Sequence, residues 1–450
     1  MVVQKFGGTS VADPDAIRRL IDIVRSARSR DGRGPAVVVS AMSGVTDALL
    51  AIAGAAGSGD QADALARADQ LRVRHLAAAG DLAGAPQVLI AQINAQFDEL
   101  AAVVRALAVL REVSPRTLDV IAAIGELLSS RLVSAALVQA GVPAEWVDAR
   151  RAIVTNDDHT RAVPMMRETN AAIRASLQPL LDNGTVPVLG GFVGATPEGR
   201  TTTLGRGGSD YSGALIGAGL QANEIQIWTD VDGMLTADPR VVDRPKLVPT
   251  LSFDEAAELA YFGAKVLHPS TILPAVERNI PVRILNSRNP SGTGTLITAE
   301  GTPQGTPLTA LACKRDVTVV DVTSSRMLMA YGFLRQVFEV FEQFRTAVDV
   351  VTTSEVSVSV TVDDRRHLDA IVESLKQYAD VAVEPEMALL CAVGDRLRNE
   401  PEIAARVVGV LEEVPLRMIS QAASRRNITV VMRQADLPHA MRRLHEEFFA

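Results

Sequence analysis

The sequence predicts an α/β protein with a parallel-rich central sheet and helices on both of its faces, followed by two ferredoxin-like units. Two observations predict this class. Strand-like runs alternate with helical ones up to about residue 287, and strands separated by helices need the crossover connections that join parallel strands. After a Gly-, Thr- and Pro-rich stretch at 289–307, the predicted order becomes β-α-β-β-α-β and then recurs.

The first strand, VVQKF, is followed by two glycines and by a helix whose start is well marked. Asp13 followed by Pro14 is a favourable N-cap and first-turn pair, and the apolar residues after it recur on one helical face. The further elements predicted for the first part are strands at 36–44, 144–150, 186–194, 224–231 and 281–287, and helical regions at 60–112, 115–140, from Ser209, and 254–266.

The second part alternates in a different order. Its first copy has strands at 317–325, 347–354, 355–363 and 381–385 and helices at 333–345 and 367–379; its second copy has strands at 387–395, 415–422 and 427–433 and helices at 402–412 and from Leu437. Two coincidentally similar α+β pieces are the alternative to a true repeat. We expect boundaries at 1–300, 301–385 and 386–450, and a homodimer formed through the strand edges of the small modules.

Composition and charge exclude several classes of function. The chain has 450 residues, and a net charge of −8 argues against a nucleic-acid binder. Two cysteines in apolar runs without paired spacing predict buried free thiols in a reducing compartment. We expect no membrane span and a cytoplasmic location. The six histidines are scattered, so any metal is expected to arrive with the substrate.

Two glycine-rich corners are candidates for a phosphate site. Gly7 and Gly8 follow Lys5 at the end of the first strand, and Gly205 opens GRGGSD at the start of a helix. Backbone N–H groups and the helix dipole favour an anion there, and Lys5 could neutralise a transferring phosphoryl group. A tight turn and a solvated lysine are the alternatives. Asp210 lies in the first turn of this helix.

Two further charged residues suggest an amino-acid ligand. The planar guanidinium of Arg206 suits a carboxylate. Glu126 lies in a mostly apolar helix beside the small residues Ala122, Gly125 and Ser129, which are expected to let a ligand approach. Such an acid is usually paired with a cation, here either a protein arginine or the ammonium of a substrate.

The segment TDVDGMLTADPR follows another predicted strand. Its DxDG resembles a calcium loop, but the glycine comes too early and no bidentate Glu closes it. Thr229, Asp230 and Arg240 fit a nucleotide clamp better. Lys265 in YFGAKVLHP is another candidate for the phosphates, with a structural helix lysine as the alternative.

In this order, KFGGTSVAD, SAMSGVTD, GEL, GFVGATPEGRTTTLGRGGSDYSGA, WTDVDGMLTADPR, FGAKVLHP and TTSEVSVS resemble the aspartokinase family over essentially the whole chain. This family has the amino-acid kinase fold followed by two ACT modules. SSRMLMAYGFL and VDVVTTSEVSVSV most resemble its lysine-regulated class, and the monofunctional form is expected because no dehydrogenase-length extension follows residue 450.

The resemblance implies transfer of the γ-phosphoryl group of ATP, with Mg²⁺ bound through ATP, to the β-carboxylate of L-aspartate, which is the first step towards lysine, threonine and methionine. Arg206 would bind the α-carboxylate, Glu126 the ammonium, and Ser40 and Thr46 the rest of the substrate, while Asp210 would orient Lys5. The residues implied on the ATP side are Lys5, Gly7, Gly8, Thr229, Asp230, Leu235, Arg240 and Lys265. Leu235 stands where relatives usually have Tyr.

The resemblance also implies L-lysine as an effector bound to the first ACT module. Asp349 and Glu355 offer two anions for its two ammonium groups. Polar residues of lysine-sensitive relatives are replaced here by Met329, Ala330 and Ala347, which would weaken or alter feedback. The implied effector residues are Met327, Phe333, Leu334, Val348, Asp349, Thr353, Ser354 and Glu355. A strand edge used only for dimerisation is the alternative.

Two other functions remain open at this point. One is an acyl-phosphate kinase of the same fold that acts on glutamate or N-acetylglutamate, although such kinases lack the paired tail modules. The other is a catalytically silent amino-acid sensor, which would have no need of Lys5, Glu126, Arg206 and Asp210 together.

Overall fold

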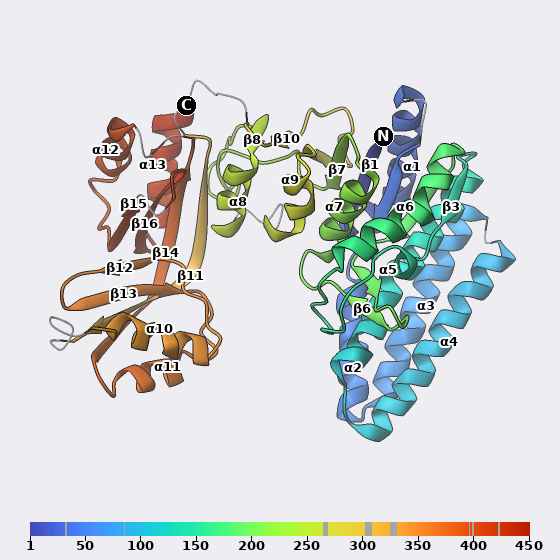
Figure 1. The fold of residues 1–450 in the computed structure, drawn as a ribbon, viewed down its shortest axis with the longest axis horizontal. Coiled ribbons are helices and arrows are strands. Elements are labelled where there is room, and N and C mark those ends of the chain that lie inside the picture. The colour runs from blue at the N-terminus through green and yellow to red at the C-terminus, as the bar shows by residue number, and fades with distance from the viewer. Residues whose placement is uncertain are drawn as a thin grey trace. The chain divides into compact units, whose positions relative to one another are not determined.

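The computed structural model describes residues 1–31, 34–84, 86–263, 269–301, 308–324, 331–395, 397, 400–421 and 424–450. The chain divides into two compact units. The first unit comprises Met1–Met234 and Leu267–Gly301, and the second comprises Leu235–Val266 and Thr302–Ala450. In Figure 1 the blue-to-green part of the ribbon belongs mainly to the first unit and the orange-to-red part to the second.

A parallel-rich sheet forms the centre of the first unit. The first unit contributes its strands in the order β3-β4-β2-β1-β7-β9-β10. All neighbours are parallel except β10, which runs antiparallel to β9. The strands are β1 Val2–Phe6, β2 Ala36–Val39, β3 Ala144–Trp146, β4 Val186–Gly190, β7 Glu224–Thr229, β9 Val282–Asn286 and β10 Thr295–Thr298. The predicted parallel-rich sheet is therefore confirmed, and the ends of β1, β2 and β7 lie side by side.

Most helices of the first unit occur where the sequence predicts them. The Asp13 side chain accepts the N–H of Ala16 at 2.8 Å and caps the first helix as expected. The helices are α1 Pro14–Asp31, α2 Val45–Ser58, α3 Gln61–Ala83, α4 Gln87–Leu110, α5 Pro115–Gln139, α6 Met166–Asp182, α7 Gly208–Leu220 and α9 Leu273–Glu277; a small hairpin pairs β5 Val193–Ala195 with β6 Thr201–Thr203.

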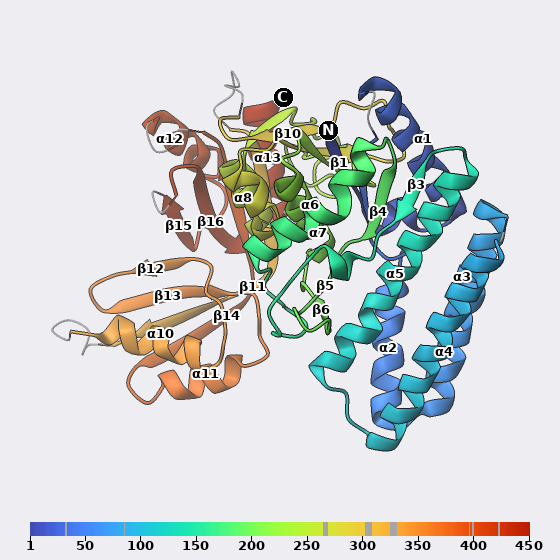
Figure 2. The same ribbon diagram turned by 45° about the vertical axis from the view of Figure 1, so that its right-hand side comes forward.

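The sequence did not predict α2, α6 or the short helix α9. Each of the two longer helices contains a residue that disfavours helices. Pro179 lies inside α6. Gly57 lies in α2, where a Cβ atom would come within 2.5 Å of the Val113 side chain. Its missing side chain permits close packing, which outweighs its low helix propensity. Figure 2 shows α2, α3, α4 and α5 running alongside one another.

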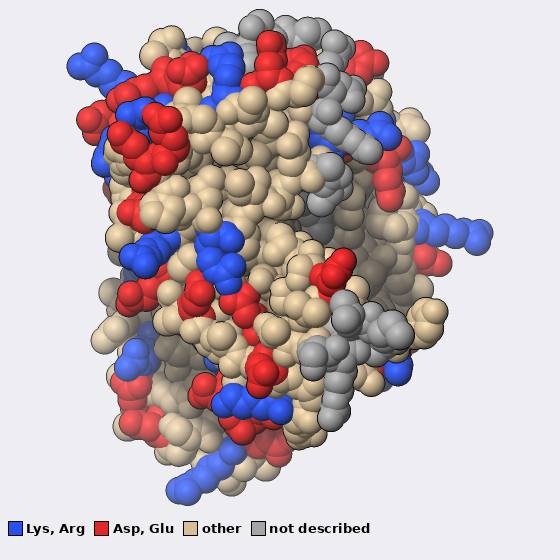
Figure 3. All heavy atoms as spheres, turned by 90° about the vertical axis from the view of Figure 1, so that its left-hand side faces the viewer, with Lys and Arg blue, Asp and Glu red and all other residues tan. Residues whose placement is uncertain are grey.

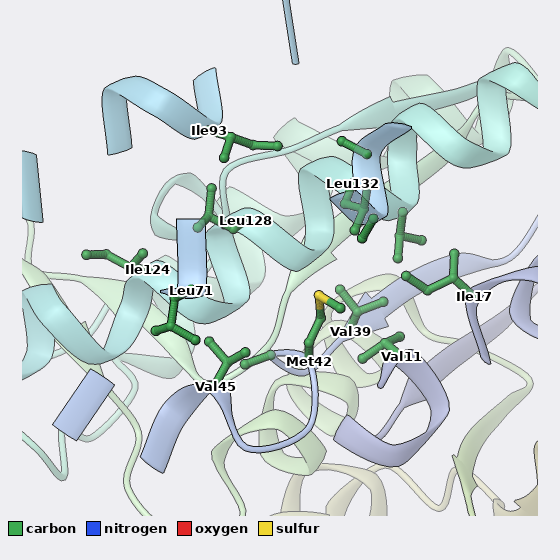
Figure 4. Close-up of a cluster of buried hydrophobic side chains, with 14 of the residues drawn as sticks. Val11, Ile17, Val39, Met42, Val45, Leu71, Ile93, Ile124, Leu128 and Leu132 are labelled. Carbon is green, nitrogen blue, oxygen red and sulfur yellow. The ribbon is translucent and has the colours of Figure 1, made fainter. Parts of the chain in front are cut away.

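Helix α5 carries much of the core of the first unit. Figure 4 shows Ile124 and Leu128 from α5 lying near Met42, Val45 and Leu71. By length and apolar composition α5 could cross a membrane, but 83% of its most apolar window is buried inside the protein. Its apolar character is explained by this burial.

The second unit contains one antiparallel sheet in the order β12-β13-β11-β14-β16-β15. Its strands are β11 Ala310–Thr323, β12 Val351–Thr353, β13 Ser357–Val362, β14 Asp380–Val393, β15 Met418–Gln421 and β16 Asn427–Arg433. Its helices are α8 Phe253–Tyr261, α10 Phe333–Gln343, α11 Leu368–Leu375, α12 Pro401–Val410 and α13 Leu437–Phe449, and a short strand, β8 Thr250–Ser252, precedes α8.

The prediction of separate strands at 381–385 and 387–395 is wrong, because both belong to the single strand β14. Pro385 suggests a break, but it lies where the pairing of β11 with β14 shifts register, between Val317 and Val319. Glu386 has a φ of 58° at the same level. A bulge tolerates the missing N–H of proline and bends the strand without ending it.

The two modules share their long strands. Ala310–Lys314 pairs with Leu389–Val393 in the second module, whereas Thr318–Thr323 pairs with β13 in the first. The fourth strand of the second module, Ala310–Lys314, therefore precedes the first module in sequence. A boundary at residue 385 would pass through β14, and the predicted boundaries stay a prediction.

The second unit also includes residues 235–263, which the sequence placed with the first part. Ala237, Val241 and Val242 belong to the same apolar core as α12 and α13. The hydroxyl of Thr236 lies 2.9 Å from His445 Nε2. Of the two cysteines, Cys391 is buried as expected but Cys313 is only partly buried.

Candidate active site

An ion pair links the two glycine-rich corners of the first unit. Lys5 lies near the end of β1, and its Nζ is 2.6 Å from Oδ1 of Asp210 in the first turn of α7. The two side chains are only 9% and 17% exposed. Gly213 lets α7 approach β1, since a Cβ atom there would lie 3.2 Å from Cβ of Lys5. The lysine is therefore held across the gap between strand and helix.

A cavity of about 270 Å³ adjoins this ion pair. It brings together five residues that the sequence proposed for substrate binding or catalysis, from four different elements and the turn after β2. Its lining residues are Lys5, Ser40, Thr46, Glu126, Phe192, Gly205, Gly207, Gly208, Ser209 and Asp210. Sequence reasoning did not select Phe192 and Ser209. Ser209 was already visible in GRGGSD, whereas Phe192 offered no local signal.

The GRGG turn, Gly205–Gly208, shapes one wall of this cavity. Gly205 and Gly207 have φ values of 75° and 71°, which favour glycine. A Cβ atom on Gly208 would lie 2.7 Å from the Phe192 ring, so this position also needs glycine. The turn leads directly into α7, whose N-terminal N–H groups favour an anion. Arg206 is exposed on this turn and does not line the cavity itself.

Glu126 is a buried carboxyl group inside the cavity. Burial raises its pKa to about 8, against the opposing effects of hydrogen bonds from backbone groups and of the Lys5 charge. Its Oε2 atom has no hydrogen-bond partner. Among the described residues, no basic side chain forms an ion pair with Glu126. The sequence left two alternatives for the cation beside Glu126, a protein arginine or the ammonium of a substrate. No arginine in the described part of the chain takes this place.

The small residues near Glu126 do not leave room for a ligand, contrary to expectation. A Cβ atom on Gly125 would already meet Cβ of Ala41 at 2.8 Å. The Ser129 hydroxyl donates to the Ser40 carbonyl at 2.7 Å. These residues bring α5 against the turn after β2, and so they place Glu126 beside Ser40.

The corner after β1 lies beside the ends of β2 and β7. A Cβ atom on Gly8 would lie 3.3 Å from the Ala41 carbonyl oxygen. The N–H of Gly7 donates to the Trp228 carbonyl at 2.9 Å. Thr229 ends β7 and its hydroxyl donates to Asp230 at 3.2 Å. The ATP-side candidates of the first unit are therefore neighbours.

Two other ATP-side candidates, Leu235 and Arg240, belong to the second unit. Leu235 forms an isolated bridge with Leu247. Arg240 pairs with Asp238 at 2.7 Å, and its side chain is 82% exposed. Lys265 lies outside the described residues.

The effector candidates of the second unit are distributed over α10 and the β12–β13 hairpin. Phe333 is buried and Leu334 is exposed, while Val348 is half-buried. Thr353, Ser354 and Glu355 are exposed at the hairpin. Met327, Met329 and Ala330 lie outside the described residues.

The Asp349 side chain is buried, and its carboxylate binds two side chains of the second unit. Lys314 Nζ lies 2.8 Å from its Oδ1 atom, and the Tyr261 hydroxyl donates to the same oxygen at 2.9 Å. The Asp349 side chain is 4% exposed. A cation of the protein itself thus already pairs with a carboxylate that the sequence assigned to the effector.

Comparison with known proteins identifies the family. The model of the amino acid kinase family matches residues 1–286, and an ACT domain model matches residues 390–448. The lysine-sensitive aspartokinase 3 of Escherichia coli is 38% identical over 100% of this chain and 99% of its own length. The chloroplastic aspartokinase 1 of Arabidopsis thaliana is 37% identical over 99% of this chain and 80% of its own length.

Solved structures agree with these matches. E. coli aspartokinase III in complex with aspartate and ADP superposes with a TM-score of 0.85 at 38% identity, covering 100% of both chains. The same enzyme in complex with lysine and aspartate gives a TM-score of 0.84 at 37% identity, again covering 100% of both chains. The predicted fold class is confirmed. With full-length similarity in both sequence and fold, the chain belongs to the aspartokinase family of amino acid kinases with ACT modules.

Proposed function

We propose that this protein transfers the γ-phosphoryl group of ATP to the β-carboxylate of L-aspartate and forms 4-phospho-L-aspartate. One observation carries the proposal: a buried carboxyl group, Glu126, and the Lys5–Asp210 ion pair line the same cavity in the first unit. The full-length match to aspartokinases supports aspartate as the substrate of this cavity. The reaction would be the first step towards lysine, threonine and methionine.

The acceptor would be held by charge complementarity. Glu126 would take the ammonium group of aspartate, and Arg206 on the GRGG turn would take the α-carboxylate as a bidentate partner. Ser40 and Thr46 would place the β-carboxylate. No strong general base is needed, because an aspartate side chain with a pKa of about 3.9 is already ionised at neutral pH.

The difficulty of the reaction is repulsion between two anions. Lys5 would offset this repulsion at the transferring group, and Asp210 would keep the lysine in place. Gly7 and Gly8 would offer backbone amides to the phosphates. The further residues proposed for ATP are Thr229, Asp230, Leu235, Arg240 and Lys265.

Mg²⁺ would enter with the nucleotide. The described residues contain no group of three or more His, Cys, Asp or Glu side chains arranged to hold a metal ion, and Asp210 is already paired with Lys5. This donor set fits an ion held chiefly by the phosphates, as is usual for Mg²⁺. When bound, the ion would add positive charge at the phosphates.

L-Lysine is the proposed effector, and it would act at the first ACT module. The lysine complex of the E. coli relative supports this effector. The proposed assembly is a homodimer formed through the ACT modules, and two such dimers could pair into a tetramer. We propose a cytoplasmic location without nucleic-acid or membrane partners. On the face drawn in Figure 3, acidic and basic side chains are interspersed, so the coloured residues of this face offer no continuous basic surface to a polyanion.

An ADP-release assay tests the activity. Mg-ATP is supplied with L-aspartate, L-glutamate or N-acetyl-L-glutamate, each with and without millimolar lysine. Of the three acceptors, we expect only aspartate to be turned over, and we expect lysine to reduce that turnover. Absence of aspartate-dependent turnover would contradict the proposal, and turnover indifferent to lysine would remove only its regulatory part.

A further inference from the structure

Asp119 is a fully buried carboxylate outside the cavity that binds three other residues. It lies in α5, and its side chain is 0% exposed. Its Oδ2 atom is 2.6 Å from His159 Nδ1. The backbone N–H of Thr160 reaches both carboxylate oxygens at 3.0 and 3.1 Å, and the Thr203 hydroxyl donates to Oδ1 at 2.5 Å. So many donors on one buried acid indicate a structural anchor that depends on its negative charge.

The anchored loop, Asn156–Val163, holds an unfavourable backbone conformation. Thr160 has a φ of 71°, which is rare for a β-branched residue. Such strain persists only where the surroundings over-determine it, and it gathers at functional sites. The loop closes on itself through Asn156, whose side chain accepts the N–H of Val163 at 2.8 Å. Its tip at His159 and Thr160 is then fixed to α5 by Asp119.

This tip supports the turn that carries Arg206. A Cβ atom on Gly205 would lie 3.2 Å from the Thr160 carbonyl oxygen and 3.6 Å from Cα of Arg161. Thr203, two residues before Gly205, is the third partner of Asp119. The GRGG turn therefore packs against the Asn156–Val163 loop at Gly205, and β6, which precedes the turn, is bound to Asp119 through Thr203.

Asp119 and Glu126 lie on the same face of α5, because residues seven apart in a helix are separated by about two turns. Glu126 reaches into the cavity directly, while Asp119 acts on the turn with Arg206. The same helix, α5, thus positions Glu126, the candidate partner of the acceptor's ammonium group, and through Asp119 the turn with Arg206, the candidate partner of its α-carboxylate.

We propose that Asp119 is a positioning residue that fixes the GRGG turn relative to Glu126 and so sets the geometry in which Arg206 meets the carboxylate of an amino-acid acceptor. The inference rests on the proposed function for the identity of that acceptor. Asp119 itself touches neither the acceptor nor the nucleotide.

The test is Asp119→Asn, which keeps the size of the side chain and one carbonyl acceptor but removes the charge. Losing charge-assisted hydrogen bonds at a buried site should raise the KM for aspartate about tenfold, with the KM for ATP within about twofold of the parent value. The matched control is Glu224→Gln. Glu224 does not line the cavity, and the variant removes the charge of an acid that pairs with Arg283 at 3.0 Å. It should change neither KM.

A double mutant distinguishes positioning from general destabilisation. If Asp119 acts through Arg206, the KM for aspartate of Asp119→Asn combined with Arg206→Ala should equal that of Arg206→Ala alone, since coupled residues are not additive. Additive effects, or equal changes in both KM values, would overturn the inference.

Amide hydrogen exchange gives a readout that does not depend on activity. Asp119→Asn should speed exchange in a peptide spanning 203–210 and leave one spanning 224–229 unchanged. If the parent protein does not phosphorylate aspartate, the proposed function fails, yet faster exchange at 203–210 would still support the anchoring. Unchanged exchange there would overturn it in an active or an inactive protein.

Discussion

The ammonium nitrogen of Lys314 lies 2.8 Å from Oδ1 of Asp349, and it also lies 4.5 Å from the centre of the Tyr261 ring. Asp363 is a second, more exposed partner of this lysine at 3.2 Å. The other oxygen of Asp349, Oδ2, is buried without a hydrogen-bond partner. A cationic effector that used Asp349 would therefore compete with a cation that the protein already supplies.

The first prediction follows from this competition. Lys314→Met keeps much of the aliphatic length but removes the charge, so Asp349 loses its cationic partner and can pair with the ammonium of lysine. The lysine concentration that gives half inhibition should fall about tenfold, as expected for one charged hydrogen bond. Inhibition curves with aspartate and ATP measure it.

Lys376→Met is the matched control, because Lys376, directly after α11, forms an exposed ion pair with Glu373 at 2.9 Å. It should leave the inhibition curve unchanged. An unchanged or weaker response to lysine in Lys314→Met would show that Lys314 does not compete with the effector.

The second prediction concerns Lys5. Replacing Lys5 by Ala removes the positive charge beside the transferring group, and kcat should fall about 10²- to 10³-fold, as for loss of one group that stabilises the transition state. Asp210→Asn leaves the lysine present but unanchored and should have a smaller effect. Steady-state ADP release measures both, and circular dichroism confirms folding. Near-normal kcat in Lys5→Ala would refute its role.

The third prediction is a pH dependence of aspartate binding. Burial raises the pKa of Glu126 to about 8, so without a ligand the group is mainly protonated at pH 7. The ammonium of aspartate binds the ionised form, and the KM for aspartate should therefore fall as the pH rises from 6 to 8. The KM for ATP should not follow this trend. A flat profile for aspartate would contradict the assignment of Glu126.

Much of the fold follows from local sequence patterns, but long-range pairing does not. The alternation of strands and helices predicted the parallel sheet of the first unit, and the recurring order predicted the two modules. The shared strands β11 and β14 were missed, because Ala310–Lys314 pairs with residues far along the chain. Pro385 suggested a strand end, whereas a bulge in the pairing accommodates it.

The candidate site shows the same division. The glycine corners, Lys5 and Glu126 could be selected from residue type and local context, and the structure places all of them at or beside one cavity. Phe192 and Asp119 could not be selected. Their importance depends on contacts with the GRGG turn and the Asn156–Val163 loop, which only the folded chain brings to them.

The last prediction is that Glu126→Gln gains stability while it loses activity. For an acid whose pKa rises from 4.5 to about 8 on folding, the unfolded chain releases the proton first as the pH increases. The folded state then binds more protons, and the free energy of unfolding falls between about pH 4.5 and 8. Gln cannot ionise, so the variant escapes this loss and should be more stable than the parent at pH 8 by about 4 kcal/mol, but about equally stable near pH 4.5. Urea unfolding at both pH values measures the difference. Equal stability of variant and parent at pH 8 would show that burial does not raise the pKa of Glu126. Unaltered turnover of aspartate in this variant would show that Glu126 does not bind the substrate.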